Sequence, residues 1–186
     1  MSDNRSTAAS AAAAPTSEFD ARGFRNALGR FPTGVAIVTT RDASGESHGL
    51  TVNSFTSASL DPPLILWSLR NASRMMPVFR EVEHFAVNLL AEEHLEEGRQ
   101  FAVSGPRSFD ANKWLVSNEH GPLLINAAAT FNCRAATRLP AGDHMVFLGE
   151  VLTFSYSTSS PLLFHAGKFF ESDELLGVRD PDAGKK

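Results

Sequence analysis

Several residue types and patterns are scarce or missing in this 186-residue chain, and each absence excludes a class of protein. Cys133 is the single cysteine, so the chain can form neither an internal disulfide nor a zinc site built from several cysteines. No run of about eighteen apolar residues occurs, which argues against a membrane-spanning helix. The 17 Lys and Arg residues are outnumbered by 21 Asp and Glu, and no basic cluster stands out, so no nucleic-acid binding is expected.

Three common functional signatures are missing as well. The apolar run 34–40 could suggest a nucleotide-binding strand, but it contains no GxGxxG and a second strand follows it, which excludes a Rossmann unit. No GxSxG occurs, so no serine hydrolase elbow is predicted. None of the six histidines has a second histidine at i+4, and no cysteine or carboxylate cluster accompanies them, so no metal centre is predicted.

The remaining composition is that of an ordinary globular protein. With 42% hydrophobic and 20% charged residues, a chain of this length is expected to form one domain around one core. We expect an Ala- and Ser-rich disordered tail over residues 1–17, the domain over 18–178 and a polar tail over 179–186. The first residues lack the apolar core of a signal peptide, so a cytoplasmic location is the default expectation, with Cys133 as a buried thiol.

Turn residues divide the chain into short strands with few helices between them. A helix is expected to begin near Ser17, with Asp20 in a capping box and an apolar stripe that must dock on another surface. A short helix holding Pro77 and a helix over 92–103 follow, while 109–121 is irregular and has no assigned role beyond connection. The pattern predicts a mainly β fold with peripheral helices, closed into an antiparallel barrel. The expected strands are 34–40, 47–53, 64–69 (buried on both faces), 85–91, 123–127, 129–138, 145–155 and 162–168.

The strand 47–53 has an unusual face. Under period-two alternation its odd-numbered residues, which are small and hydrogen-bonding, share one side and leave room for a flat ligand. Hydroxyl side chains continue from Ser54 to Ser59, before Pro62 and Pro63 force an extended exit. Ser- and Thr-rich strands are also common in all-β proteins, so the spacing alone leaves a purely structural role equally open.

An ordered series of motifs resembles the flavin reductase-like family, the small NAD(P)H:flavin oxidoreductases that serve as reductase components of two-component monooxygenases. The resemblance covers about residues 22 to 170, and its ordered series is far more specific than any single motif. The matching segments are FPTGV at 31–35, TT at 39–40, GLTVNSF at 49–55, SLDPP at 59–63, FAVNLL at 85–90, GDH at 142–144, GEV at 149–151 and PLLF at 161–164.

This resemblance implies the FMN-binding split barrel, a Greek-key antiparallel barrel with helices outside, and a homodimer with the flavin near the interface. It also implies hydride transfer from NADH or NADPH to FMN, with FAD as a second possible flavin, and a partner oxygenase that receives the reduced flavin. His144 is placed at the nicotinamide site by the same resemblance. The residues implied in cofactor binding are Ser47, His48, Gly49, Leu50, Thr51, Asn53, Ser54, Ser68, Leu69, Arg70, Ser73, Arg74, Phe101, Arg107, Phe164, His165 and Gly167.

Two of these residues also have ordinary interpretations. Arg74 could be a solvated surface arginine, or a guanidinium beside free backbone N–H groups that binds the flavin phosphate. His144 follows Gly142 and Asp143, which are typical of a hairpin turn, although Asp143 could equally orient the imidazole. His165 departs from the family pattern, because many relatives have an aromatic residue there.

The rival interpretation from another class is a non-enzymatic split barrel that binds flavin or haem as a carrier or sensor. A binder has no use for a nicotinamide pocket, so the motif at 142–144 favours the enzyme. The absence of an acid–base pair fits hydride transfer, since the cofactors carry the reactivity. The choices between FMN and FAD, between NADH and NADPH, and among oxygenase partners are not readable from the sequence.

Overall fold

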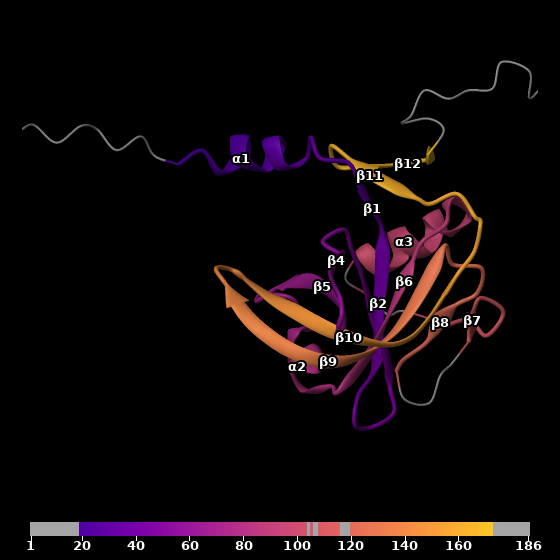
Figure 1. The fold of residues 1–186 in the computed structure, drawn as a ribbon. Coiled ribbons are helices and arrows are strands. Elements are labelled where there is room, and N and C mark those ends of the chain that lie inside the picture. The colour runs from indigo at the N-terminus through magenta and orange to yellow at the C-terminus, as the bar shows by residue number, and fades with distance from the viewer. Residues whose placement is uncertain (1–18, 104, 106–107, 116–119, 173–186) are drawn as a thin grey trace, which may run out of the picture.

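Seven antiparallel strands form the main sheet of the computed structural model, which describes residues 19–103, 105, 108–115 and 120–172. Their order across the sheet is β3-β2-β6-β9-β10-β5-β4, and the sheet rolls into a split barrel (Figure 1). The predicted tails, the domain limits at 18 and 178, and Arg107 lie outside the described residues. The strands are β2 (Ala36–Arg41), β3 (Ser47–Val52), β4 (Thr56–Leu60), β5 (Pro63–Arg70), β6 (His84–Leu89), β9 (Ala129–Ala141) and β10 (His144–Tyr156).

The fold is therefore mainly β, an antiparallel Greek-key split barrel, as predicted. A serine hydroxyl ties β5 to the loop that follows β3, where the barrel closes. The Ser54 Oγ accepts from the Ser68 N–H at 3.0 Å and donates to the Ser68 carbonyl at 3.1 Å. Because one hydroxyl replaces a strand-to-strand ladder at this point, the barrel is held together there while space is left beside the loop.

Two apolar cores explain why β2 has apolar residues on both faces. Ala36 and Val38 point into the barrel core, whereas Val35 and Ile37 belong to a second core outside the barrel. The barrel core centres on Trp67, whose ring stacks on Phe147 with centroids 4.4 Å apart. The second core lies between the outside of the barrel and helix α3.

Helices lie at the periphery, in the positions that the sequence predicted. α2 (Met76–Glu81) contains Pro77 in its first turn, as expected. The predicted helix 92–103 is confirmed as a 3-10 turn, η1 (Glu92–His94), that continues into α3 (Leu95–Ala102).

Helix α1 (Ala21–Leu28) begins later than predicted. Asp20 is its N-cap rather than a residue inside it, since the Asp20 carboxylate accepts from the N–H groups of Arg22 and Gly23. The predicted apolar stripe is present, but none of the residues of α1 is buried within the described part of the chain.

Other differences concern strand ends and burial. In β5, Ile65, Trp67 and Leu69 are buried but the alternate residues are only half-buried, so this strand is not buried on both faces. The predicted strand 162–168 is a hairpin, because Ala166 and Gly167 adopt φ of +48° and +84° and reverse the chain.

That hairpin, β11 (Leu163–His165) and β12 (Lys168–Phe170), joins β1 (Thr33–Gly34) in a small separate sheet beside α1 (Figure 1). The segment 109–121 is less irregular than expected. It contains β7 (Trp114–Leu115), which pairs with β8 (Leu123–Leu124), the short remainder of the predicted strand 123–127. Within the described residues, no helix is long and apolar enough to cross a membrane.

Candidate functional site

Helix α3 covers the first half of the unusual face of β3. A Cβ added to Gly49 would lie 2.9 Å from the Phe101 ring, so only glycine allows this close approach. The Thr51 hydroxyl donates to the Gly98 carbonyl of α3 at 2.8 Å. The expectation that this whole face is open to a flat ligand is thus corrected, because a helix packs where the ligand was expected.

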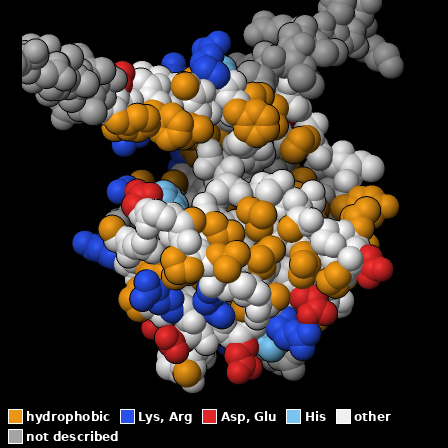
Figure 2. Space-filling view, turned by 60° about the vertical axis from the view of Figure 1, so that its left-hand side comes forward, with side chains coloured by type: hydrophobic (Ala, Val, Ile, Leu, Met, Phe, Trp, Pro, Cys, Tyr) orange, Lys and Arg blue, Asp and Glu red, His pale blue; other side chains and the backbone are white. Residues whose placement is uncertain are grey.

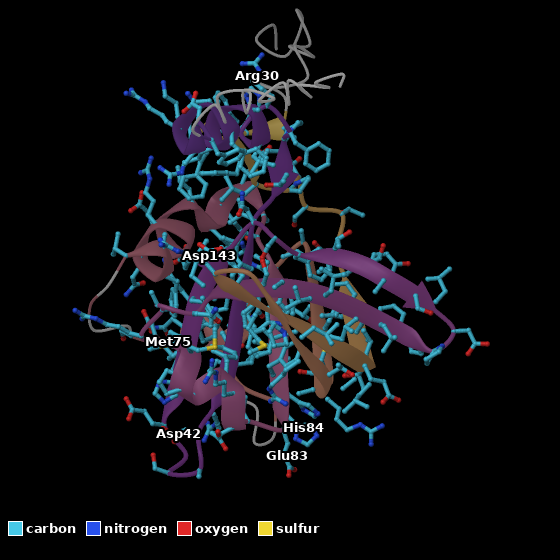
Figure 3. All side chains as sticks on the ribbon, turned by 90° about the vertical axis from the view of Figure 1, so that its left-hand side faces the viewer. Arg30, Asp42, Met75, Glu83, His84 and Asp143 are labelled. Atoms are coloured by element: carbon cyan, nitrogen blue, oxygen red, sulfur yellow. The ribbon has the colours of Figure 1, made fainter. Side chains whose placement is uncertain are left out.

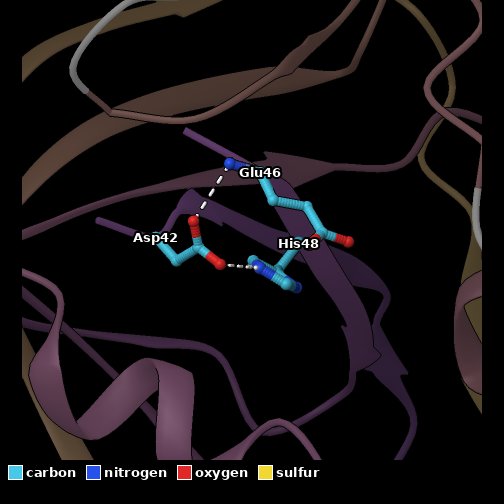
Figure 4. A group of neighbouring side chains, drawn as sticks. All are labelled: Asp42, Glu46 and His48. Atoms are coloured by element: carbon cyan, nitrogen blue, oxygen red, sulfur yellow. Dashed lines mark hydrogen bonds and ion pairs between the residues drawn. The ribbon is translucent and has the colours of Figure 1, made fainter. Parts of the chain in front are cut away.

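The end of β3 nearest Ser47 is closed by the turn between β2 and β3 (Figure 4). Hydrogen bonds to the Asp42 carboxylate hold this turn together, and it is called the knot hereafter. The Asp42 carboxylate accepts from the Ser44 hydroxyl, from two turn N–H groups and from His48 Nε2, the last at 2.8 Å. The hydrogen bond from Ser44 and then that from His48 hold the pKa of Asp42 well below its usual range. Glu46 brings a second carboxylate within 4.8 Å of this pair. The hydrogen bonds of the knot account for the positions of Asp42 and His48 as parts of the β2–β3 hairpin.

The opposite end of β3 opens into a hollow of about 380 Å³, the first hollow. Its walls come from the end of β3, the loop after it, the end of β5 and the start of β10. Most of the side chains are small or hydroxylated, which leaves backbone groups accessible. The lining residues are Leu50, Thr51, Val52, Asn53, Ser54, Ser68, Leu69, Arg70, Ala72, Ser73 and His144.

His144 is brought to the first hollow by the β9–β10 hairpin. Gly142 adopts φ +59°, which allows the two-residue turn, and the first residue of β10 then pairs with Arg70 of β5. Asn71 fastens the turn to the barrel, because its backbone N–H donates to the Asp143 carbonyl at 2.8 Å. The turn is therefore held in register with the hollow.

The imidazole of His144 is oriented by its neighbour. Its Nδ1 lies 2.7 Å from Asp143 Oδ1, while 37% of its side chain remains exposed. The hydrogen bond and charge of His144, and the charge of Arg70, lower the pKa of Asp143. When the ring is neutral and Nδ1–H donates to the carboxylate, Nε2 is left as the acceptor.

A second hollow of about 560 Å³ lies beyond Ser73 and shares four lining residues with the first. Arg74 lines it, and none of the hydrogen bonds or ion pairs among the described residues uses the Arg74 guanidinium. Two backbone N–H groups near the start of α2 are already engaged, since Met75 donates to the Ser73 hydroxyl and Met76 donates to the Ser73 carbonyl. The Arg74 guanidinium is therefore the candidate group for an anion in this hollow.

Together the two hollows, hereafter the cleft, fit a flavin nucleotide. The first has small walls and backbone groups suited to the edges of a planar ring, and the second offers a free guanidinium for a phosphate. The shared residues, Leu50, Thr51, Ala72 and Ser73, make the two hollows continuous. In Figure 3, Met75, which lines the second hollow, lies between Asp143, the neighbour of His144, and Asp42 near the lower end of the barrel.

Most of the predicted cofactor residues line this cleft, but two groups do not. Ser47 and His48 lie at the knot, and Gly49 lies under Phe101. Phe164, His165 and Gly167 lie in the small sheet, where Phe164 packs on the second core. Their part in cofactor binding stays a prediction.

Several lining residues were not predicted. Ala72 and Met75 flank residues that were, so the continuous segment 70–75 could have been found from Arg70 and Arg74. Ala102, Val103 and Gly105 follow Phe101 and line the second hollow. Ala102 and Gly105 were nevertheless anticipated, because the resemblance places the segment after Phe101 beside the flavin, and only Val103 carries no such signal.

Comparison with known proteins identifies the family. A model of the flavin reductase like domain matches residues 28–173. The chain is similar to FMN reductase (NADH) SmoA of Agrobacterium fabrum, with 43% identity over 150 residues, 81% of this chain and 85% of that protein.

A second relative is the reductase component of the flavin-dependent trigonelline monooxygenase of Acinetobacter baylyi, 37% identical over 158 residues. The match covers 83% of this chain but 51% of the relative, so the chain spans about half of its length. The solved NADH:FAD oxidoreductase SgcE6 of Streptomyces globisporus, in complex with NAD and FAD fragments, aligns with a TM-score of 0.77 at 34% identity. That alignment covers 88% of this chain and 95% of the other. The chain therefore belongs to the flavin reductase-like family.

Proposed function

We propose that the protein is an NAD(P)H:flavin oxidoreductase that transfers a hydride from reduced nicotinamide to FMN or FAD. The observation that carries the proposal is the continuous cleft, with an oriented imidazole at one end and a free guanidinium at the other. The names of the relatives, an FMN reductase and an NADH:FAD oxidoreductase, support the same chemistry.

Binding and orientation are the work of the protein in this proposal. The flavin ring, when bound, supplies the hydride acceptor, so no acid–base pair is needed. Backbone groups of Asn53 and Ser54 would fix the edges of the ring in the first hollow, and Arg74 would pair with the phosphate in the second. The backbone groups are held by the barrel before ligand arrives, which limits the cost of ordering them.

His144 takes the role of positioning the nicotinamide. Asp143 accepts the Nδ1–H, which leaves Nε2 as a hydrogen-bond acceptor at the mouth of the first hollow. A carboxamide N–H of the nicotinamide is the matching donor. The imidazole thus contributes a hydrogen bond and a fixed place, and it moves no proton in the chemical step.

The reaction class is tested by steady-state oxidation of NADH and NADPH with FMN, FAD or riboflavin added. We expect oxidation that depends on flavin, and the ranking of the six combinations identifies the preferred pair. Flavin binding without oxidation of either nucleotide would instead support the carrier or sensor interpretation.

We further propose that reduced flavin passes to a separate oxygenase in the cytoplasm, where Cys133 is expected to stay a thiol. The support is that a 37% identical relative is named as a reductase component. If the flavin is handed over by diffusion, it must leave the protein after reduction. Ultrafiltration under anaerobic conditions should recover more flavin in the filtrate after reduction than before it, and equal retention would argue against release.

We also propose that the protein forms a homodimer. Figure 2 shows apolar side chains gathered along α1 and across the face of the main sheet that is turned to the viewer. Phe24 and Phe31 are 51% and 75% exposed, and Phe154 and Tyr156 of β10 are 67% and 80% exposed. Apolar patches of this kind mark protein interfaces.

The second copy would cover these side chains. Sedimentation velocity at micromolar concentration should give a dimer, and Phe154→Asp should shift it toward the monomer without a change in circular dichroism, because the residue is exposed in the single chain. A wild-type protein that sediments as a monomer would contradict this part of the proposal.

A further inference from the structure

The segment 109–115 is attached to α3 by a buried carboxylate. The Glu97 side chain is only 5% exposed, and its carboxylate pairs with the Lys113 ammonium. A buried carboxylate without a partner is strongly unfavourable, so this ion pair fixes Lys113 against the helix. The hydrogen bond and the charge of Glu97 raise the pKa of Lys113, and Asp110 and Glu96 add to this.

Aromatic rings extend the contact from the ion pair toward the cleft. Trp114, next to Lys113, is buried, and its ring centroid lies 5.4 Å from that of Phe101 and 5.0 Å from that of Phe109. Phe101 and Phe109 are themselves 5.2 Å apart. The three rings form one cluster at the last turn of α3.

The other side of the segment is fastened to the barrel. The Lys113 carbonyl accepts from the Ile125 N–H at 2.9 Å, and Trp114 pairs with Leu124 of β8. The Leu124 N–H in turn donates to the buried Asn88 side chain of β6 at 2.8 Å. The segment therefore links α3 to the wall of the barrel at two points.

The end of α3 is also the outer wall of the second hollow. Phe101 and Ala102 line that hollow together with Arg74, and Phe101 packs against Gly49. A shift of the last turn of α3 would change the width of the hollow, although neither Lys113 nor Trp114 lines it.

We propose that Lys113 is a positioning residue for flavin binding: through Glu97 and the ring cluster it holds the α3 wall of the second hollow at the spacing that a phosphate bound by Arg74 requires. This inference rests on the proposed function, because it assigns the second hollow to the phosphate-bearing part of the flavin. The segment 109–115, which does not line the cleft, acquires a role in selecting FMN over riboflavin.

The test compares Lys113→Met with Arg99→Met. Arg99 pairs with Glu96 on the same helix, but both side chains are well exposed, so its loss removes a similar ion pair without leaving a buried charge. Hydrogen exchange of the amides at 98–103 in the ligand-free protein should be faster in Lys113→Met and unchanged in Arg99→Met. If the two variants exchange alike, the Glu97–Lys113 pair does not hold the end of α3. The proposal is then refuted without reference to any ligand.

Flavin titrations then test the consequence. We expect the Kd for FMN to rise about five- to tenfold in Lys113→Met and the Kd for riboflavin to change less than about twofold. If the Kd changes equally for both ligands, or no more than in Arg99→Met, the Glu97–Lys113 pair has a structural role only. A wild-type protein that binds no flavin would refute the proposed function and, with it, the positioning role.

If Lys113→Met fails to fold, the cause is the buried Glu97 carboxylate, which has lost its partner. The double variant Glu97→Gln/Lys113→Met has no buried charge left unpaired and serves in its place, with the same expected direction in both measurements.

Discussion

Two histidine–aspartate pairs lie at opposite ends of the barrel, and the closest atoms of the two partners are almost equally far apart in both. His48 Nε2 lies 2.8 Å from Asp42, and His144 Nδ1 lies 2.7 Å from Asp143. Their surroundings differ. Asp42 is saturated by turn N–H groups and a hydroxyl, and His48 is 15% exposed, whereas His144 is 37% exposed and lines the first hollow.

The difference shows that such a pair becomes a candidate site through what surrounds it, not through its own geometry. In the knot, the pair stabilises a hairpin and every acceptor atom of Asp42 is used. At the cleft, the aspartate fixes one ring nitrogen and the other is left for a ligand. Variants that change one end of the barrel and leave the other unchanged test this difference.

The largest effect is expected for Arg74→Ala, which removes the guanidinium that lines the second hollow. Loss of a charge-assisted hydrogen bond to phosphate should weaken FMN binding by about 1.5–3 kcal/mol, while riboflavin, which has no phosphate, should be affected far less. Fluorescence titration measures both ligands. Arg41→Ala, near the knot, is the matched control and should change neither Kd. If FMN and riboflavin lose the same affinity, Arg74 does not bind the phosphate.

His144→Ala is expected to have the next largest effect. It should lower kcat/KM for NAD(P)H by about 1–3 kcal/mol, the range for one lost hydrogen-bonding contact, with the flavin Kd within about twofold of wild type. Stopped-flow reduction of bound flavin, run beside a flavin titration, separates the two effects.

His48→Ala, its counterpart in the knot, should lower the melting temperature, and a fall in kcat/KM beside it would support the cofactor-binding role that the resemblance implies for His48. If His144→Ala binds flavin poorly but reduces it normally once saturated, the assignment to the nicotinamide is wrong.

Asp143→Asn should produce a smaller kinetic loss. The amide can still accept from Nδ1–H, but it no longer carries the charge that holds the ring. We expect kcat/KM for NAD(P)H to fall severalfold, less than in His144→Ala, with KM affected more than kcat. A loss as large as that of His144→Ala would mean that the carboxylate does more than orient the ring.

The smallest effect on activity is expected for Asp42→Asn, which should change stability instead. Because the pKa of Asp42 is lowered in the folded protein, its charge contributes stability that is present above its ordinary value of 3.8 and is lost as pH falls below it. The melting temperature of wild type should exceed that of Asp42→Asn at pH 7, and the gap should close in acid. A gap that is constant with pH would exclude the charge as its cause.

Periodicity and turn chemistry were enough to predict the barrel. The residues of β2 alternate between two cores, which a run of Val, Ile and Thr anticipates, and Gly142 marks the β9–β10 turn correctly. The hairpin at Ala166 was missed, because alanine at positive φ is unusual and carries no turn signal. The predicted docking of the α1 stripe stays a prediction, since no residue of α1 is buried within the described part of the chain.

The candidate site was predictable where consecutive residues form it. Leu69, Arg70, Ser73 and Arg74 follow one strand into one turn, so their order along the chain places them together. Alternation also shows that Gly49 and Thr51 share a face, but it cannot tell that α3 covers that face. The distance of Phe164 from the cleft depends on the path of the whole chain.

The central claim is that flavin held in the cleft accepts a hydride from a reduced nicotinamide nucleotide. Its most direct test is anaerobic stopped-flow mixing of wild-type protein and FMN with NADH, and in parallel with NADPH, while the absorbance of oxidised flavin is followed. We predict bleaching whose rate saturates with nucleotide concentration and is much slower in His144→Ala. Flavin that is bound by titration, yet keeps its oxidised spectrum with both nucleotides, would contradict the account.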